Sequence, residues 1–316
     1  MQLGVALIGY GHWGPNLARA LDGVDGAALQ AVCVRRPAAA EAVARERPDV
    51  EATTDLDAVL ARPDVDIVVV ATPAPTHVEL GGRALRAGKH VLVEKPLAPS
   101  LEAAEELAAV AAAERRLLMV GHEYVYHPVV RRLAELLRAG ALGDLACITS
   151  ERGNPTGTPA DRGVLWNLAP HDLSIVVFLL GAGARRVSAR AACDDVVFLT
   201  LELTCGVLVE VQCSWAAPQK TRRMTLTGSA GNAVFDELAA DPLALYARRD
   251  GAAPERRDVA PPAAAEPLAA EWEELVAAVR EGREPATGAA HALAVQRLLQ
   301  AADASLAAGG APVAPA

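Results

Sequence analysis

Short apolar runs alternate with amphipathic, alanine-rich stretches through residue 120. The runs predict buried strands at Val5–Ile8, Leu29–Val34, Ile67–Ala71, His90–Val93 and Leu117–Val120. Helical periodicity between them predicts helices at Asn16–Leu21, Ala38–Arg47, His77–Ala87 and Leu101–Arg115. This β-α-β-α order predicts an α/β protein that begins with a doubly wound parallel sheet over residues 1–121.

The pattern changes after Gly121, where strands with period-two alternation become dominant. Helices are predicted at Pro128–Arg138, Leu165–Leu180, Leu268–Glu281 and His291–Ala308. Strands are predicted at Leu145–Arg152, Val196–Thr204, Val207–Trp215, Arg222–Thr227, Ala233–Asp236 and Leu243–Tyr246, with Cys205-Gly206 as a hairpin tip. Residues 122–316 are therefore expected to form a second α/β domain with an open, largely antiparallel sheet.

A glycine motif follows the first strand. The segment Leu3–Gly14 reads LGVALIGYGHWG, in which Gly9, Gly11 and Gly14 form a G-x-G-x-x-G turn between strand and helix. Gly9 permits the tight turn, Gly11 lets the backbone approach phosphates, and Gly14 lets helix and strand pack closely. The helix N-terminus favours an anion. These three glycines, with His12 and Trp13 between them, are predicted to bind a dinucleotide pyrophosphate.

The end of the second strand indicates which dinucleotide is bound. Enzymes that use NAD commonly place an acidic residue there for the ribose 2′-hydroxyl, whereas arginine suits a 2′-phosphate. This chain has Arg35 and Arg36 and no acid at that position. A guanidinium can hold phosphate bidentately, so NADP is predicted. NAD is the alternative, with both arginines merely solvated.

Composition and charge argue against several classes of protein, namely nucleic-acid-binding, membrane, disulfide-rich and metal-binding proteins. The 316 residues are 52% hydrophobic and carry a net charge of −9, which argues against a nucleic-acid partner. No signal peptide precedes the first strand and no charge-free apolar stretch is long enough to span a bilayer, so a cytoplasmic protein without a membrane partner is expected. Five cysteines without a C-x-x-C make a disulfide framework unexpected, and no His/Cys/Asp cluster has metal-ligand spacing.

Several linked motifs resemble one family of oxidoreductases. They are GYGHWGPN at 9–16, ATPAPTH at 71–77, AGKHVLVEKP at 87–96, ALGD at 141–144, LWNLAPHD at 165–172 and HALAVQRLLQAADAS at 291–305. In this order they resemble the glucose–fructose oxidoreductase and inositol dehydrogenase (Gfo/Idh/MocA) family, most closely its branch acting on modified and nucleotide-linked sugars. The resemblance implies a Rossmann domain followed by an α/β domain, and a homodimer or homotetramer formed through the second sheet. A largely apolar exposed sheet face would itself need cover.

The resemblance also implies roles for individual residues. Lys95 follows a strand at the edge where parallel sheets bind ligands, and it matches the family lysine that stabilises the reacting oxygen. His171 matches the family's catalytic histidine and would carry the proton. The family's cofactor contacts match Glu94, the turn Ala71-Thr72-Pro73 and, less specifically, His77, which could equally serve helix-start packing.

One position departs from the family. The common pattern has an aspartate four residues before the catalytic histidine, and this chain has Asn167. An amide cannot form an ion pair with an imidazolium, and Asp172 lies about 100° round the helix. Lys95, Tyr124 or Tyr126 is then an alternative proton carrier, although packing is the favoured role of the two tyrosines. Substrate contacts are predicted at Lys95, Tyr124, His127, Asn167, His171 and Asp172, together with the 153–163 loop.

These observations predict an NAD(P)-dependent oxidoreductase acting on a hydroxyl or keto carbon of a sugar, nucleotide-linked sugar or cyclitol. An NADP preference would favour ketone reduction. The first alternative keeps the fold and oxidises an amino sugar or aminocyclitol with NAD. The second is a cofactor-sensing protein without turnover, which the retained Lys95 and His171 disfavour and Asn167 favours.

Overall fold

The chain folds into two compact units. The computed structural model describes residues 2–155, 163–248, 254–259 and 266–316. One unit comprises residues 1–123 and 266–296, and the other comprises residues 124–265 and 297–316. The boundary predicted near residue 121 is close to the first crossing between the units. The sequence patterns did not indicate that residues 266–296 return to the N-terminal unit.

The N-terminal unit is built on a six-stranded parallel sheet with strand order β3-β2-β1-β4-β5-β6. Its strands are β1 (Leu3–Ile8), β2 (Ala27–Cys33), β3 (Glu51–Thr53), β4 (Ile67–Val70), β5 (His90–Val93) and β6 (Leu118–Val120). The order reverses between β1 and β4, which is where such sheets bind ligands beyond the carboxyl ends of their strands. The predicted doubly wound sheet is confirmed.

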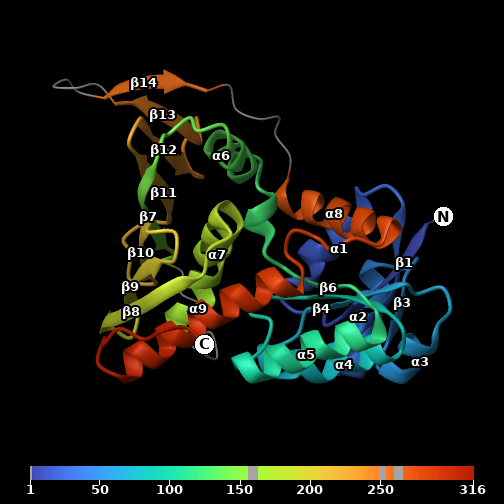
Figure 1. Cartoon of the computed structure of the whole chain (residues 1–316). Coiled ribbons are helices and arrows are strands. Elements are labelled where there is room, and N and C mark those ends of the chain that lie inside the picture. The colour runs from blue at the N-terminus through green and yellow to red at the C-terminus, as the bar shows by residue number, and fades with distance from the viewer. Residues whose placement is uncertain (1, 156–162, 249–253, 260–265) are drawn as a thin grey trace. The chain divides into compact units, whose positions relative to one another are not determined.

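Helices cover both faces of this sheet. They are α1 (Gly14–Asp22), α2 (Pro37–Glu46), α3 (Leu56–Ala61), α4 (His77–Arg86), α5 (Leu101–Glu114), α8 (Pro267–Glu281) and the start of α9 (Ala289–Ala307). Helices α4 and α5 lie side by side on one face, and α1 and α8 pack together on the other (Figure 1). Trp272 of α8 is fully buried, and its indole N–H donates to the Leu17 carbonyl of α1 at 3.1 Å. Helix α8 is thus an integral layer of this unit.

The second unit contains an eight-stranded sheet with order β14-β13-β12-β11-β7-β10-β9-β8. Its strands are β7 (Leu145–Gly153), β8 (Ala184–Cys193), β9 (Val196–Leu203), β10 (Leu208–Ser214), β11 (Thr221–Gly228), β12 (Gly231–Asp236), β13 (Leu243–Ala247) and β14 (Glu255–Asp258). Only β7 and β10 pair in parallel, so the largely antiparallel sheet is confirmed. The β9–β10 hairpin also forms as predicted, with Gly206 at φ +90° in its tip.

Helices α6 (Pro128–Arg138) and α7 (Gly163–Leu180) cover one face of the second sheet (Figure 1). Helix α7 is the core helix of the unit. Its length and mean hydropathy of 1.5 would suit a membrane span, yet 67% of it is buried inside the protein. Burial by the surrounding sheet and helix explains why its sequence is apolar almost all round.

The opposite face of this sheet is not the apolar surface that was expected. The strand register places mainly polar side chains there, namely Thr149, Glu151, Thr200, Glu202, Glu210, Gln212, Arg223 and Thr225. Two large apolar side chains stand among them, Phe198 at 44% and Leu208 at 41% exposure. The expectation of a largely apolar face is therefore wrong, because the outward positions of these strands are mostly Thr, Glu, Gln and Arg.

Candidate active site

Two of the predicted glycines are required by the backbone of the N-terminal unit. Gly9 has φ +96°, and a Cβ on it would lie 2.5 Å from the Ala71 carbonyl oxygen at the end of β4. Gly14 opens α1, and a Cβ there would lie 2.9 Å from the Gly9 carbonyl oxygen. Only glycine therefore allows β1, β4 and α1 to approach one another so closely.

Gly11 has a different environment. Apart from Gly11 itself and its two chain neighbours, none of the described residues has an atom within 4 Å of the position that a Cβ on Gly11 would take, and Gly11 is exposed along with His12. Trp13 precedes α1, and no side chain caps the first turn of that helix. An open glycine backbone beside uncapped helix N–H groups fits a dinucleotide pyrophosphate.

Arg35 and Arg36 lie immediately beyond β2, as predicted. Both are exposed, and neither forms an ion pair with any residue that the structure describes. Gly9 N–H donates to the Cys33 carbonyl at 2.8 Å, so the glycine turn and the end of β2 are neighbours. The two guanidinium groups therefore stand at the edge of the sheet where the adenosine ribose of a dinucleotide would lie.

His77 contacts the protein backbone, and its side chain is not exposed for the predicted contact with the cofactor. It is 1% exposed, and its ring nitrogens lie 2.9 Å from the Pro96 carbonyl and 2.7 Å from the Thr72 carbonyl. Burial lowers its pKa, although both carbonyl contacts act in the opposite direction. The imidazole thus connects the turn after β4 to the turn that carries Lys95. The cofactor-lining role of Ala71, Thr72 and Pro73 stays a prediction.

Glu94 and Lys95 directly follow β5, with Pro96 next in a cis peptide linkage. Lys95 is half-buried at the carboxyl ends of the strands. The Glu94 carboxylate accepts from the Lys95 backbone N–H at 3.2 Å and from the Trp13 side chain. It lies against Gly121, where a Cβ would come within 3.0 Å of it. Glycine at the end of β6 therefore makes room for this carboxyl group.

Two further acids surround Glu94. Burial raises the pKa of Glu94 to about 7, and repulsion from Glu123 adds to that, while Lys95 and Trp13 act against it. Glu271 of α8 is 1% exposed, and burial with repulsion from Glu94 and Glu123 raises its pKa well above the ordinary value. Sequence reasoning missed Glu271, because a glutamate in an amphipathic helix is normally solvated.

In the second unit, α7 carries the predicted catalytic histidine. Asn167 and His171 are one helical turn apart and half-buried, whereas the residues between them are fully buried. They therefore share the accessible stripe of α7, as their i,i+4 spacing predicts. Nothing in the structure describes how this stripe lies relative to Lys95, so the convergence of Lys95 and His171 stays a prediction.

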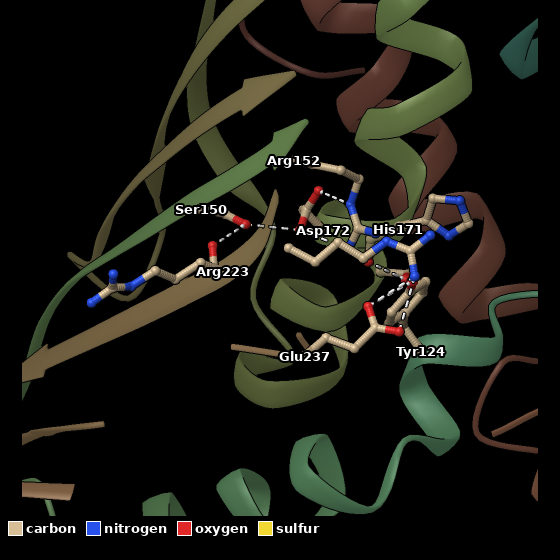
Figure 2. A network of polar contacts seen from close by, with 9 residues as sticks. Tyr124, Ser150, Arg152, His171, Asp172, Arg223 and Glu237 are labelled. Atoms are coloured by element: carbon tan, nitrogen blue, oxygen red, sulfur yellow. Dashed lines mark hydrogen bonds and ion pairs between the residues drawn. The ribbon is translucent and has the colours of Figure 1, made fainter. Parts of the chain in front are cut away.

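Asp172 is not placed to contact a substrate. Its carboxylate is 2% exposed and accepts from Arg152 through Nε at 2.7 Å and Nη2 at 3.1 Å. Ser150 donates to it at 2.8 Å. Because both oxygens are occupied by residues of β7, Asp172 anchors α7 to the sheet instead of binding polyol groups (Figure 2). Removing one partner of such a buried pair typically costs about 3–5 kcal/mol.

Tyr124 lies beside His171 (Figure 2). It belongs to the 3₁₀ turn η2 (Glu123–Tyr126), and its ring meets the imidazole edge to face with centroids 5.1 Å apart. Its hydroxyl donates to Glu237 at 3.0 Å, and Arg222 in turn donates to both oxygens of Glu237. The pairs Arg152–Asp172 and Arg222–Glu237 leave this part of the site without excess charge.

His127 is occupied by a structural contact. Its Nδ1 accepts from the Val129 backbone N–H at 3.1 Å, which caps α6, and its ring packs on Phe235 at 4.9 Å. Burial lowers its pKa. The 153–163 loop lies mostly outside the described residues, so its predicted role in substrate binding stays a prediction. Sequence reasoning also missed Arg152 and Glu237, whose partners are far away in the chain.

Comparisons with known proteins agree with this architecture. Residues 3–122 match the family model described as "Oxidoreductase family, NAD-binding Rossmann fold" (GFO_IDH_MocA), and residues 130–234 match the GFO/IDH/MocA C-terminal domain. The chain belongs to the GFO/IDH/MocA oxidoreductase family. Its NAD-binding Rossmann domain and the family suggested by its motifs are thus confirmed.

Relatives of this family member act on sugars and cyclitols. It is 31% identical to D-apiose dehydrogenase of Paraburkholderia graminis, in an alignment that covers 94% of the chain and 85% of that enzyme. It is 33% identical to inositol 2-dehydrogenase of Rhizobium meliloti, over 61% of the chain and 59% of that enzyme. Among solved structures, UDP-N-acetylglucosamine 3-dehydrogenase of Acidithiobacillus ferrooxidans superposes with a TM-score of 0.85 at 27% identity, covering 98% of the chain and 99% of that structure.

Proposed function

We propose that this oxidoreductase transfers a hydride between NAD(P) and a hydroxyl or keto carbon of a sugar, nucleotide-linked sugar or cyclitol. The observation that carries the proposal is the place of Lys95, half-buried directly after β5. The open glycine turn lies at the same edge of the sheet, because Ile8 at the end of β1 pairs with Val70, and Val70 pairs with Val93 at the end of β5. A cation at that edge is suited to an oxygen that gains negative charge in the reaction.

The protein's own groups divide the remaining work. The nicotinamide dinucleotide, when bound, accepts or supplies the hydride. Lys95 holds the substrate oxygen and stabilises its alkoxide character, while His171 takes the hydroxyl proton in oxidation or returns it in reduction. Gly9, Gly11, Gly14 and the start of α1 hold the pyrophosphate.

The named relatives and the local charge balance support a polyol as the part of the substrate that binds near His171. D-apiose, inositol and UDP-N-acetylglucosamine, which three of the relatives are named for, all present several hydroxyl groups. Around Tyr124, which contacts His171, Arg152 pairs with Asp172 and Arg222 pairs with Glu237. A charge-balanced surface rich in donors and acceptors favours hydroxyl groups over a strongly charged ligand.

Replacing Lys95 tests the proposal. Lys95→Ala should leave dinucleotide binding nearly unchanged and lower kcat by about 100-fold or more, the scale of a lost electrostatic donor. The measurement is turnover on a panel of sugars, cyclitols and nucleotide-linked sugars, with cofactor affinity followed separately. Exposed Lys220→Ala is the matched control. Wild-type turnover in Lys95→Ala would refute the assigned role, and dinucleotide binding without turnover of any compound would favour a cofactor sensor.

NADP is the proposed cofactor, with NAD as the alternative. The support is the exposed pair Arg35 and Arg36 beyond β2, which has no ion-pair partner in the described part of the chain. Replacing both by alanine should weaken NADP by about 100-fold or more, since each hydrogen bond to a charged group contributes about 1.5–3 kcal/mol, and should barely change NAD affinity. Exposed Arg45→Ala on α2 is the control. Equal losses for the two dinucleotides would remove the argument for NADP and leave NAD-linked amino-sugar or aminocyclitol oxidation as the better reading.

A homodimer or homotetramer through the second sheet also remains part of the proposal. Exposed Phe198 and Leu208 lie on its uncovered face, among threonines and charged residues. Apolar anchors inside a polar surface are typical of interfaces between chains.

A further inference from the structure

The imidazole of His171 rests against an aromatic ring. The Tyr124 ring meets it at 71° between ring planes, with the centroids 5.1 Å apart. An edge-to-face contact of this kind has a defined geometry, so the position of one ring restricts the other. The family places a carboxylate one turn before the histidine, and the neutral Asn167 of this chain supplies no such charge.

The Tyr124 ring is itself fixed from several directions. Its hydroxyl donates to Glu237 at 3.0 Å. The guanidinium groups of Arg152 and Arg222 lie 4.5 and 5.6 Å from the ring centroid. Arg222 also donates to both oxygens of Glu237, at 2.9 and 3.0 Å. Tyr124 is 4% exposed, so these contacts are largely shielded from competing water.

The contacts close into a ring that returns to the histidine. From His171 they pass to Tyr124, from Tyr124 to Arg152, and from Arg152 to Asp172, which is bonded to His171 through the backbone of α7 (Figure 2). Ser150 holds Asp172 from the sheet side at 2.8 Å. Turning the imidazole out of its plane would disturb the edge-to-face contact with Tyr124.

We propose that Tyr124 is a positioning residue for His171. The ring of Tyr124 sets the plane of the imidazole, in the way that the family's aspartate, which this chain lacks, would orient it. The proposal rests on the proposed role of His171 as proton carrier. It assigns the hydroxyl of Tyr124 to the Glu237 anchor and not to the substrate. A base held in its reactive orientation avoids the rate loss that small misplacements cause.

Paired substitutions test the proposal in the full-length protein. Tyr124→Met removes the ring at similar volume, Tyr124→Phe keeps the ring without the hydroxyl, and His171→Asn removes the base. Tyr246→Met on β13 is the matched control in the same unit. For each variant kcat and KM are measured on the best compound of the panel, with melting temperature and dinucleotide affinity as checks on folding.

Tyr124→Met should lower kcat by about 10- to 100-fold with little change in KM. Tyr124→Phe should stay within about threefold of the wild type, and Tyr124→Met should cause no further loss in a His171→Asn background. Losses that multiply in the double variant, or a KM that rises with kcat unchanged, would show a direct substrate contact and overturn the proposal.

A loss above tenfold in Tyr124→Phe would overturn it as well, even if Tyr124→Met does not fold. If His171→Asn keeps wild-type kcat, the proton-carrier role fails together with this inference. If Tyr124→Met keeps the kcat of the wild type while His171→Asn loses activity, this inference fails but the proton-carrier role of His171 stands.

Discussion

Glu94, a predicted cofactor contact, links the stability of the protein to pH. Its carboxyl group lies beside Glu123 and Glu271, and burial raises its pKa to about 7 from an ordinary value of 4.5. A folded-state pKa above the unfolded value means that folding takes up a proton between those two pH values. The raised pKa costs no stability below pH 4.5, lowers the free energy of unfolding as pH rises from 4.5 towards 7, and lowers it no further above that.

Glu94→Gln should therefore stabilise the protein more at pH 8 than at pH 5. The glutamine stays neutral, so it removes a penalty of up to about 3 kcal/mol that the wild type carries only at the higher pH. The measurement is the melting temperature without cofactor at both pH values, with exposed Glu273→Gln on α8 as control. An equal shift at both pH values would show that the carboxyl is already ionised at pH 5.

Residues at strand ends could be predicted, whereas residues defined by a distant partner could not. Lys95 and Gly9 follow buried strands, and the ends of parallel strands meet at one edge. Arg152 lies on an inward position of β7 that hydrophobic patterning reserves for apolar residues, and its partner Asp172 comes from α7. The family resemblance predicts substrate contacts at Asp172 and His127, but buried hydrogen bonds occupy the Asp172 carboxylate and a helix cap occupies Nδ1 of His127.

At the scale of elements, helices and strands with a long apolar pattern could be predicted from the sequence, whereas short or polar elements could not. Strand β3, helix α3 and strand β8 carried no clear period, because β3 is three residues long and β8 lies at the edge of its sheet. Strand β14 was also not predicted, because it is an edge strand made of charged residues. An edge strand needs no continuous apolar run, since it has a neighbouring strand on one edge only and its other edge faces solvent.

In the strand–turn–helix element β1–α1, one glycine is required by the fold and another by the predicted ligand, so a pair of glycine-to-alanine substitutions tests the two roles separately. Gly9→Ala should lower the melting temperature clearly, because its Cβ would lie 2.5 Å from the Ala71 carbonyl oxygen at a positive φ. Gly11→Ala should leave the melting temperature within about 1 °C and weaken dinucleotide binding by about tenfold or more, since its Cβ meets only open space that the pyrophosphate needs. Thermal melting and dinucleotide titration measure both. Unchanged binding in Gly11→Ala would argue against a phosphate at this turn.

At the scale of the whole molecule, the open sheet face bears on assembly. Phe198→Glu with Leu208→Glu should convert the proposed oligomer to monomer, because buried apolar anchors carry most of an interface's binding energy. Light scattering on a sizing column gives the mass. Leu238→Glu is the control, since Leu238 is 50% exposed in the turn after β12. An unchanged mass for the double variant would place the contact between subunits elsewhere.

The return of α8 to the N-terminal unit has a consequence for synthesis on the ribosome. The last strand of the dinucleotide-binding sheet ends at residue 120, yet Trp272, which bonds to Leu17, is synthesised only after the strands of the second unit. One side of α1 therefore stays exposed on the nascent chain while the second unit is synthesised. A gene cut after the last strand of that sheet would encode a fragment that exposes this apolar surface and tends to aggregate.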